Sequence, residues 1–458
     1  MDSMIPFWGT SKKVLLLGSG FVARPTVDIL SKEGISVTVA CRTLESAEKL
    51  AAGLSRTSAI SLDVNDEAVL EHEVGKHGLV ISLIPYIHHV KVIKAAIKQK
   101  KHVVTTSYVS PAMMELDEEA KEAGITVMNE IGLDPGLDHL YAVKMIDEVH
   151  KKFGRITSFL SYCGGLPAPE CSDNPLGYKF SWSSRGVLLA LRNSAKYYKD
   201  GKIVEVESED LMAEAKPYHL MPAFNLVGYP NRDCTSYRYR YNMPDATDLV
   251  RGTLRYGGFP QFVKVLVDMG FLSEEEQDFL QPSDHPTLWK EATAKILGEG
   301  SNAEHDLISA IKSKTSFADE EEEQRIIAGL RWIGLFSDEF VDKKGTPLDC
   351  LCAVLEKKCQ YEEGERDAVY LQHKFGIEWS DGKKEVRTST LIEYGDPKGY
   401  SAMAKLVGVP CAVAVLKVLD GTISEHGILA PMKPEINDPL IKELKEKYGI
   451  FLKDKTVA

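Results

Sequence analysis

The stretch Val14-Leu15-Leu16-Leu17-Gly18-Ser19-Gly20-Phe21-Val22-Ala23 joins a run of buried-type aliphatic residues to the pattern Gly-x-Gly-x-x-Ala. In a strand–turn–helix unit that binds a dinucleotide, the first glycine makes the tight turn. The second glycine lets backbone N–H groups approach a pyrophosphate, and the small third residue lets the helix pack closely on the strand. The stretch therefore predicts a dinucleotide-binding unit at the start of the chain.

A second hydrophobic run, residues 37–40, ends about 20 residues beyond the glycines, where NAD-binding proteins place an acid for the ribose hydroxyls. This chain carries Cys41, Arg42 and Thr43 there, and a guanidinium beside a hydroxyl suits a ribose 2′-phosphate. The residues therefore predict NADP(H) as the cofactor. Two alternatives stay open: the glycines form a turn in another kind of α/β protein, or Arg42 is simply an exposed cation at a strand end.

Strand and helix patterns alternate from this start to residue 134. Alternating units of this length predict a parallel sheet with helices on both faces, and ligands bind outside the carboxyl ends of such strands. The predicted strand ends carry small, polar or turn-forming residues, at 63–64, 82–86, 105–108 and 132–136.

The pattern changes beyond residue 134. Strands of a second sheet are predicted at 156–162, 202–207, 224–227, 236–241, 248–256, 368–379 and 384–394, with a helix around 185–198. Between 258 and 359 only helical spacing is visible. The expected fold class is α/β. It comprises a Rossmann-type dinucleotide-binding domain (1–134 and 395–458), a mixed α/β substrate domain (135–257 and 360–394) and an all-helical insertion (258–359).

The composition limits the kinds of molecule that the protein is expected to bind. The formal net charge of −12 argues against nucleic acid or an anionic membrane surface, so an anionic substrate must meet a local cluster of cations. No apolar run is expected to span a membrane and no signal features are visible, so we expect a cytoplasmic protein. The eight cysteines lack the paired spacing of a zinc site, so no metal is expected.

Short stretches spread over nearly the whole chain carry a family resemblance. They lie at 17–22, 40–43, 84–86, 104–108, 129–136, 161–167, 179–186, 251–256 and 401–405. Taken together and in this order, they closely resemble the saccharopine reductases, the NADP-dependent, L-glutamate-forming saccharopine dehydrogenases of fungal lysine biosynthesis. Each string is modest alone, but their order and joint presence are highly specific.

The resemblance implies a particular reaction. L-Glutamate would condense with L-2-aminoadipate 6-semialdehyde, and NADPH would reduce the resulting imine to L-saccharopine on the α-aminoadipate route to lysine. The partners implied are therefore these small molecules, with a homodimer as a further expectation. The chain is too short to carry the lysine–ketoglutarate reductase half of the fused animal enzymes, so a single activity is expected.

The expected cofactor contacts lie at the strand ends. They are Gly18, Ser19, Gly20 and Phe21 at the pyrophosphate, Cys41, Arg42 and Thr43 at the 2′-phosphate, Asp63 and Val64 near the adenine, and Leu83, Thr105 and Thr106 toward the nicotinamide half. Leu133 and Asp134 stand where cofactor and substrate would meet, and the resemblance adds Trp182.

Saccharopine carries three carboxylates, which need several fixed donors, and arginine suits them best. The resemblance implies substrate contacts at Ser107, Tyr108, Asp134, Arg232, Gly252, Thr253, Leu254 and Arg255. The catalytic acid–base candidates are Asp134 and Cys163. Structural interpretations also stay open, because Asp134 could be a turn aspartate before Pro135 and Cys163 a small packing residue.

Two other functions stay open from the sequence. One is a related NADPH-dependent imine reductase such as carboxynorspermidine synthase, which charge reversal at Arg232 would distinguish because a diamine lacks the carboxylates. The other is a non-catalytic NADP sensor, which would bind cofactor without turning over glutamate and the semialdehyde.

Overall fold

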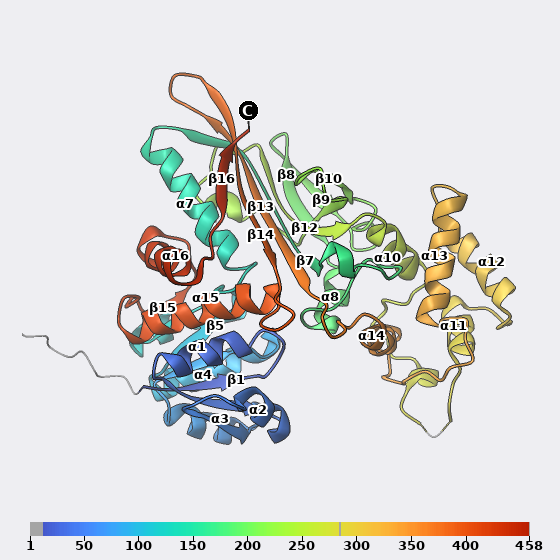
Figure 1. Cartoon of the computed structure of the whole chain (residues 1–458), viewed down its shortest axis with the longest axis horizontal. Coiled ribbons are helices and arrows are strands. Elements are labelled where there is room, and N and C mark those ends of the chain that lie inside the picture. The colour runs from blue at the N-terminus through green and yellow to red at the C-terminus, as the bar shows by residue number, and fades with distance from the viewer. Residues whose placement is uncertain (1–11, 284, 458) are drawn as a thin grey trace, which may run out of the picture.

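The computed structural model describes residues 12–283 and 285–457, and within them a parallel sheet forms the core of the first domain (Figure 1). Its strand order is β15-β6-β5-β4-β1-β2-β3. The central strands are almost wholly aliphatic because both faces of the sheet are covered. The strands are β1 (Lys13–Leu17), β2 (Ser36–Cys41), β3 (Thr57–Ser61), β4 (Leu79–Ser82), β5 (His102–Thr105), β6 (Thr126–Met128) and β15 (Gly427–Leu429).

Alternate residues of β1 face opposite layers of helices. Leu16 packs with α1 and α15, whereas Leu15 packs with α3 and α4. This arrangement confirms the predicted Rossmann-type sheet. The helical segments of this part are α1 (Arg24–Lys32), α2 (Leu44–Ala51), α3 (Glu67–Gly75), η1 (Tyr86–His88), α4 (His89–Gln99), α5 (Pro111–Met114) and α6 (Asp117–Glu122).

The C-terminal segment returns to this sheet through α15 (Ala402–Leu419), β15 and α16 (Pro434–Tyr448). The α15 helix is long and apolar enough to cross a membrane, so the expectation that no run reaches that length is wrong. Its hydrophobic window is 67% buried, and Thr26 of α1 donates a hydrogen bond to its Gly408 carbonyl at 2.9 Å. These contacts identify α15 as a core helix of the folded domain.

A second, mixed sheet stands above the first in Figure 1, and α7 (Leu137–Lys151) packs against it. Its order is β10-β11-β12-β7-β13-β14-β16, with β8 paired to β12 and β9 paired to β8. Among the described strand pairs of this second sheet, only β7–β12 is parallel. The strands are β7 (Arg155–Pro167), β8 (Ala195–Lys199), β9 (Lys202–Val206), β10 (Lys216–Tyr218), β11 (Leu226–Pro230), β12 (Asp248–Tyr256), β13 (Asp367–Glu378), β14 (Lys384–Tyr394) and β16 (Lys453–Thr456).

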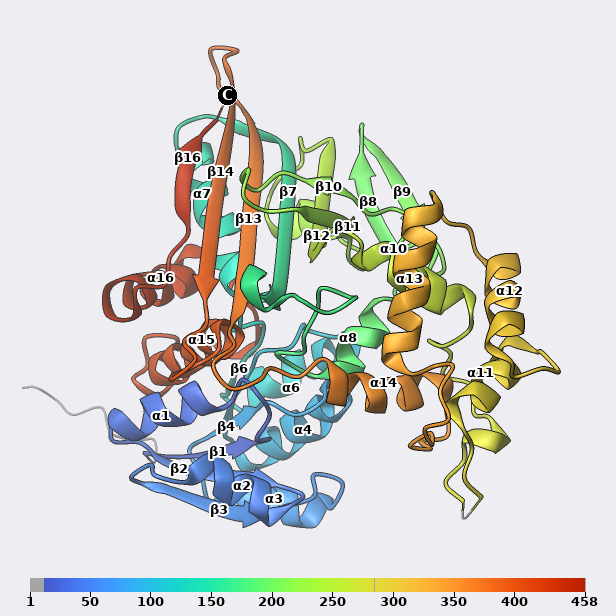
Figure 2. The same ribbon diagram turned by 45° about the vertical axis from the view of Figure 1, so that its right-hand side comes forward.

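A helical unit projects to one side of the second sheet (Figure 2). The acidic run that starts α13 is explained by its cap, since the Asp319 carboxylate accepts a hydrogen bond from the Glu322 N–H at 2.9 Å. The unit contains α10 (Phe259–Asp268), η3 (Asp278–Leu280), α11 (Trp289–Leu297), α12 (Glu304–Lys314), α13 (Glu320–Ile333) and α14 (Pro347–Lys358).

Three local predictions differ from the structure. The segment 236–241, predicted as a strand, forms the one-turn helix α9 (Tyr237–Arg240). The segment 185–198, predicted as one helix, forms the short helix α8 (Ser184–Ala190) followed by strand β8. The tail predicted to lie wholly in the nucleotide domain ends instead in β16, which pairs with β14. Residues 1–11 and 458 of the predicted first domain lie outside the described residues. The short η2 (Pro169–Cys171) follows β7.

Asp367 ties the second sheet to the first domain. Its carboxylate, 1% exposed at the start of β13, accepts hydrogen bonds from the Ala402 N–H at 2.6 Å and the Met403 N–H at 2.8 Å. These N–H groups open α15, which lies on the first sheet, so one buried carboxylate caps the helix that links the two cores.

Asp367→Ala should lower the free energy of unfolding by about 2–4 kcal/mol, because two buried N–H groups lose their acceptor. Urea denaturation measures the change. Asp420→Ala is the matched control. That exposed carboxylate accepts from the Thr422 N–H and forms an exposed ion pair with Lys417 at 3.8 Å, so its loss should change stability by less than about 1 kcal/mol. Equal stability of the two variants would contradict the assignment.

Candidate active site

The glycine loop after β1 has the geometry of a phosphate cradle. Gly18 has φ +102°, and a β-carbon there would lie 2.8 Å from the Leu83 carbonyl oxygen. A β-carbon on Gly20 would meet no atom within 4 Å, so the space above the second glycine is open. The first glycine is therefore required by the crowded turn, and the second leaves room for a ligand, which fits a dinucleotide pyrophosphate.

The helix ends around the loop also suit anions. Both α1, with Ala23 at its N-cap, and α2, with Thr43 at its N-cap, lack a side-chain cap. Helix N-termini with free N–H groups attract negative charge. Arg42 is exposed beside Thr43, and no acidic partner holds its guanidinium among the residues that the structure describes. The residues present therefore fit a dinucleotide with a 2′-phosphate.

The other predicted cofactor residues gather at the same edge. The carboxyl ends of parallel strands share one edge of a sheet, which brings together Cys41, Asp63, Val64, Leu83, Thr105, Thr106 and Leu133. Phe21 and Trp182 line one cavity of about 570 Å³, so the glycine loop and the second domain face each other there. Ser19 lies in the loop itself.

Tyr108, Asp134 and Arg251 form a polar centre between the two sheets. The Tyr108 hydroxyl donates to Asp134 Oδ1 at 2.7 Å, and Arg251 Nη2 donates to the same oxygen at 2.6 Å. Arg251 Nη2 also donates to Asp138 Oδ2 at 2.5 Å. Tyr108 follows β5, Asp134 precedes α7 and Arg251 lies on β12, so the centre joins both sheets. Sequence reasoning missed Arg251 and Asp138, although Arg251 opens one of the family stretches.

The two carboxylates that share Arg251 titrate differently. Burial raises the pKa of Asp134, and the nearby Asp138 charge adds to this, against the opposing effects of Arg251 and Tyr108. Burial also acts on Asp138, but His139 and Arg251 outweigh it and hold the pKa of Asp138 below its usual value. Such a separation leaves Asp138 as the fixed anion and Asp134 as the group able to take up a proton.

Two arginines have no carboxylate partner among the described residues: Arg232 next to this centre and Arg255 four residues beyond Arg251 on β12. The Arg255 guanidinium lies over three aromatic rings, those of Tyr178, Tyr229 and Phe259. Arg232, with φ +57°, lies over the Tyr108 ring at 5.6 Å. Arg255 is 5% exposed, its Nη1 donates to the neighbouring Leu254 carbonyl, and its Nε has no partner. A buried guanidinium is normally paired. These cations are therefore available to carboxylates of a ligand.

The remaining predicted substrate residues differ in what they offer. The Ser107 hydroxyl meets His89 Nε2 at 2.8 Å, and burial lowers the pKa of His89 to about 4, so the imidazole is neutral. Leu254 is fully buried in the hydrophobic core, and a β-carbon on Gly252 would lie 2.3 Å from the Tyr162 ring. These two residues therefore present only backbone atoms, whereas Thr253 alternates with them on the Arg251 face.

Cys163 lies on β7 opposite Thr253. It is buried, and burial followed by the charges of Asp134 and Asp138 raises the pKa of its thiol well above the ordinary value. The thiol therefore stays protonated at neutral pH, which suits a packing residue better than a base.

The model of the saccharopine dehydrogenase NADP binding domain matches residues 14–128, and the saccharopine dehydrogenase C-terminal domain matches 132–450. Saccharopine dehydrogenase [NADP(+), L-glutamate-forming] from Pyricularia oryzae is 67% identical, covering 98% of this chain and 100% of that protein. The Saccharomyces cerevisiae protein of the same name is 60% identical over 98% of this chain and 100% of its own. The apo structure of histidine-tagged saccharopine dehydrogenase (L-Glu forming) from that yeast superposes with a TM-score of 0.89 at 59% identity, covering 98% and 100% of the two chains.

Arg251→Met should lower the free energy of unfolding by about 3–5 kcal/mol at pH 7, since it leaves two buried carboxylates without their cation. Asp138, with its depressed pKa, contributes stability above its unfolded pKa and loses it as the pH falls through the folded value. The deficit of the variant should therefore be largest at neutral pH and shrink as the pH falls below about 4, the pKa of an unfolded aspartate. Urea melts at several pH values measure this.

Arg155→Met is the matched control, because the Arg155–Glu378 ion pair is solvent-exposed. Its loss should change stability by at most about 1 kcal/mol at any pH. An Arg251→Met protein as stable as this control would overturn the assignment of Arg251 as the buried counter-charge.

Proposed function

Because this chain belongs to the saccharopine dehydrogenase family, we propose that it forms L-saccharopine from L-glutamate and L-2-aminoadipate 6-semialdehyde. The reaction is reversible, depends on NADP(H) and belongs to lysine biosynthesis. The chain is an oxidoreductase of the L-glutamate-forming type, as are the full-length relatives at 67% and 60% identity. The observation that carries the substrate assignment is a pair of guanidiniums without a carboxylate partner among the described residues. Arg232 lies over the Tyr108 ring, and Arg255 lies on the same strand as Arg251.

The cofactor residues of this chain bind and orient. Backbone N–H groups of the Gly18–Phe21 loop and the uncapped α1 terminus hold the pyrophosphate, and Arg42 with Thr43 holds the 2′-phosphate. When bound, the reduced nicotinamide supplies the hydride that reduces the C=N bond, and the oxidised nicotinamide accepts a hydride in the reverse direction.

The substrate residues supply charge where the ligand is charged. Arg232 and Arg255 bind carboxylates of saccharopine, and Ser107 and Tyr108 add donors from the loop after β5. The charge of Arg251 is already neutralised by Asp134 and Asp138, so Arg251 holds these two carboxylates in place and does not bind the substrate. This division of roles explains why an acidic protein binds a substrate with three carboxylates.

Asp134 is the residue that we assign to proton transfer. Imine formation requires protons to be added and removed, and a group with a pKa shifted toward neutrality does this best. Asp134 has the raised pKa, and Tyr108 and Arg251 hold its Oδ1 in place. Cys163, with its still higher pKa, packs beside the reacting atoms in this proposal.

The direct test is the absorbance of NADPH. Purified protein should consume NADPH when L-glutamate and the semialdehyde are both present, and should produce it from saccharopine and NADP+. An unchanged absorbance with the cofactor bound would instead favour the sensor hypothesis. Preference for a diamine and an aldehyde would favour a carboxynorspermidine synthase, although neither alternative finds support among the relatives.

We also propose that the protein is a cytoplasmic homodimer. Its described cysteines are all free thiols, and thiols stay reduced in the cytosol, which supports this compartment. Light scattering measures the assembly, with about twice the chain mass of 50.8 kDa expected for the dimer and the single mass contradicting it.

Arg42→Asp should reduce the preference for NADP+ over NAD+ in saccharopine oxidation by about 10²-fold or more. The variant replaces a cation by an anion at the 2′-phosphate, and each 1.4 kcal/mol lost is tenfold in affinity. The ratio of kcat/KM for the two cofactors measures this. Arg56→Asp, which exchanges another exposed arginine in the same domain, should leave the ratio unchanged. A preserved ratio in Arg42→Asp would refute the assignment.

Asp134→Asn should lower kcat for saccharopine oxidation by about 10²–10⁴-fold, the range for loss of a general acid–base. In the unmodified protein, kcat/KM should decline as the pH falls through a carboxyl pKa above the usual aspartate value, because protonated Asp134 no longer accepts a proton. That limb should be missing from the residual activity of the variant. Asp381→Asn, at an exposed hairpin turn, should keep it.

A further inference from the structure

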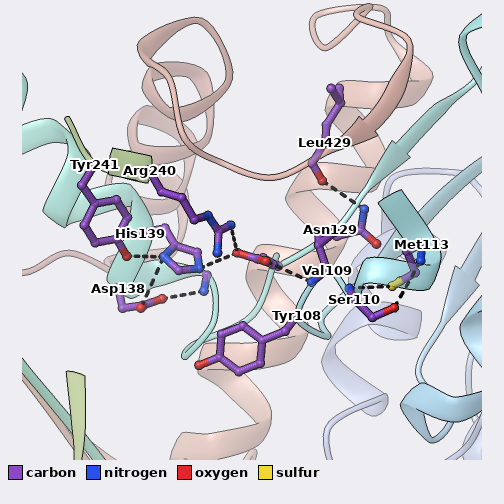
Figure 3. A network of polar contacts seen from close by, with 12 residues as sticks. Tyr108, Val109, Ser110, Met113, Asn129, Asp138, His139, Arg240, Tyr241 and Leu429 are labelled. Carbon is purple, nitrogen blue, oxygen red and sulfur yellow. Dashed lines mark hydrogen bonds and ion pairs between the residues drawn. The ribbon is translucent and has the colours of Figure 1, made fainter. Parts of the chain in front are cut away.

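Glu130 is a buried carboxylate that the reaction described above does not use. It follows β6, is 0% exposed and has φ +60°, a backbone conformation that residues with a β-carbon rarely adopt. A charged side chain in such a position requires compensating contacts. Its contacts lead to Val109 in the loop that carries Tyr108, to His139 on α7 and to Arg240 on α9, and these three residues are labelled in Figure 3.

Glu130 holds the backbone on both sides of Tyr108. Its own N–H donates to the Ser107 carbonyl at 3.1 Å, and its Oε1 accepts from the Val109 N–H at 3.0 Å. Ser107 and Val109 are the immediate neighbours of Tyr108. One residue therefore fixes the two peptide groups between which the tyrosine side chain projects.

The other carboxylate oxygen of Glu130, Oε2, contacts one arginine and one histidine. Arg240 Nη2 donates to Oε2 at 2.9 Å, and His139 Nε2 lies 2.8 Å from the same atom at ion-pair distance. The Tyr241 hydroxyl meets the other imidazole nitrogen, Nδ1, at 2.5 Å (Figure 3). Burial would raise the pKa of Glu130, but His139, Arg240 and the Val109 N–H outweigh it and lower the pKa, so the carboxylate is charged.

The contacts close a ring around the reacting centre. His139 follows Asp138 on α7, and Asp138 binds Arg251, which binds Asp134. Asp134 in turn accepts the Tyr108 hydroxyl. Tyr108 is thus held through its backbone by Glu130 and through its hydroxyl by Asp134. Glu130 contacts His139 directly, and Asp134 is linked through Arg251 to Asp138, the residue before His139 on α7.

We propose that Glu130 is a positioning residue for Tyr108, which it clamps so that the hydroxyl stays on Asp134 and the ring stays between Arg232 and Arg251. This inference rests on the proposed function, because Tyr108 is there a substrate contact. A purely structural role would lower stability without changing the kinetics of the folded enzyme. A positioning role changes the kinetics through Tyr108.

The test uses three single variants of the full-length chain. Glu130→Ala removes both acceptors, and we expect kcat/KM for saccharopine to fall by about 10–100-fold, since small displacements of catalytic groups cost this much. Glu130→Gln keeps an oxygen for the Val109 N–H and should recover most of the loss. Glu385→Gln is the matched control. Glu385 lies on β14, and its carboxylate accepts hydrogen bonds from Arg387 and Trp379, so this variant should keep the full kcat/KM.

A double-mutant cycle with Tyr108→Phe shows whether the loss of kcat/KM in Glu130→Ala depends on the Tyr108 hydroxyl. If Glu130 acts through the tyrosine, Glu130→Ala should cost less than about threefold in the Tyr108→Phe background, because coupled residues are not additive. The affinity for NADPH, measured by fluorescence titration, should stay within about twofold in every folded variant.

Each outcome bears on one proposal. An inactive unmodified protein would refute the proposed function and, with it, the clamp, because Tyr108 would then have no substrate to contact. With an active protein, equal losses in the two backgrounds would overturn the clamp, as would full activity of folded Glu130→Ala. If Glu130→Ala does not fold, Glu130→Gln carries the same cycle, and an additive loss in it overturns the proposal.

Discussion

The guanidinium of Arg251 is the contact on which the rest of the site depends. It lies 6% exposed on a strand of the second sheet and binds two carboxylates, Asp134 and Asp138, at the point where the chain leaves the first sheet. A buried cation of this kind is stable only with its anions in place. The buried ion pairs therefore tie the second sheet to the chain segment that follows the first sheet.

The same sharing of one cation separates the chemistry of the two acids. Asp138 is held as an anion by His139 and Arg251, whereas Asp134 is left with a raised pKa and a tyrosine hydroxyl on its oxygen. Arg232 and Arg255 remain without anions of their own within the described residues. The site is thus internally balanced at its centre and cationic at its margins, which is the complement of a ligand with several carboxylates around one reacting nitrogen.

The sequence predicted the parts of the fold that are set by local pattern. The glycine loop, the parallel sheet, the helical unit and the hairpin strand β14 follow from periodicity and turn chemistry. The tyrosines at 237, 239 and 241 were misassigned to a strand, because a helical turn places Tyr237 and Tyr241 together on His139 just as alternation would place them on one face. Long-range pairing decides between these two arrangements.

The candidate site was predictable in its cofactor half and less so in its centre. The roles assigned to Arg42 and to the glycines depend on their neighbours in the sequence, so local pattern was enough to predict them. Arg251, Asp138 and Glu130 act through partners more than a hundred residues away or through the backbone of another loop, as with the 113 residues between Asp138 and Arg251. The available signal for Glu130 and Arg251 was their place within the family stretches at 129–136 and 251–256, whereas Asp138 lies outside both stretches.

The most direct measurement is a crystal structure of the chain with NADPH and saccharopine bound. The account predicts carboxylate oxygens of the ligand within hydrogen-bond distance of Arg232 and Arg255, with Arg251 still on Asp134 and Asp138. Carboxylates bound elsewhere, with both arginines facing solvent, would contradict it.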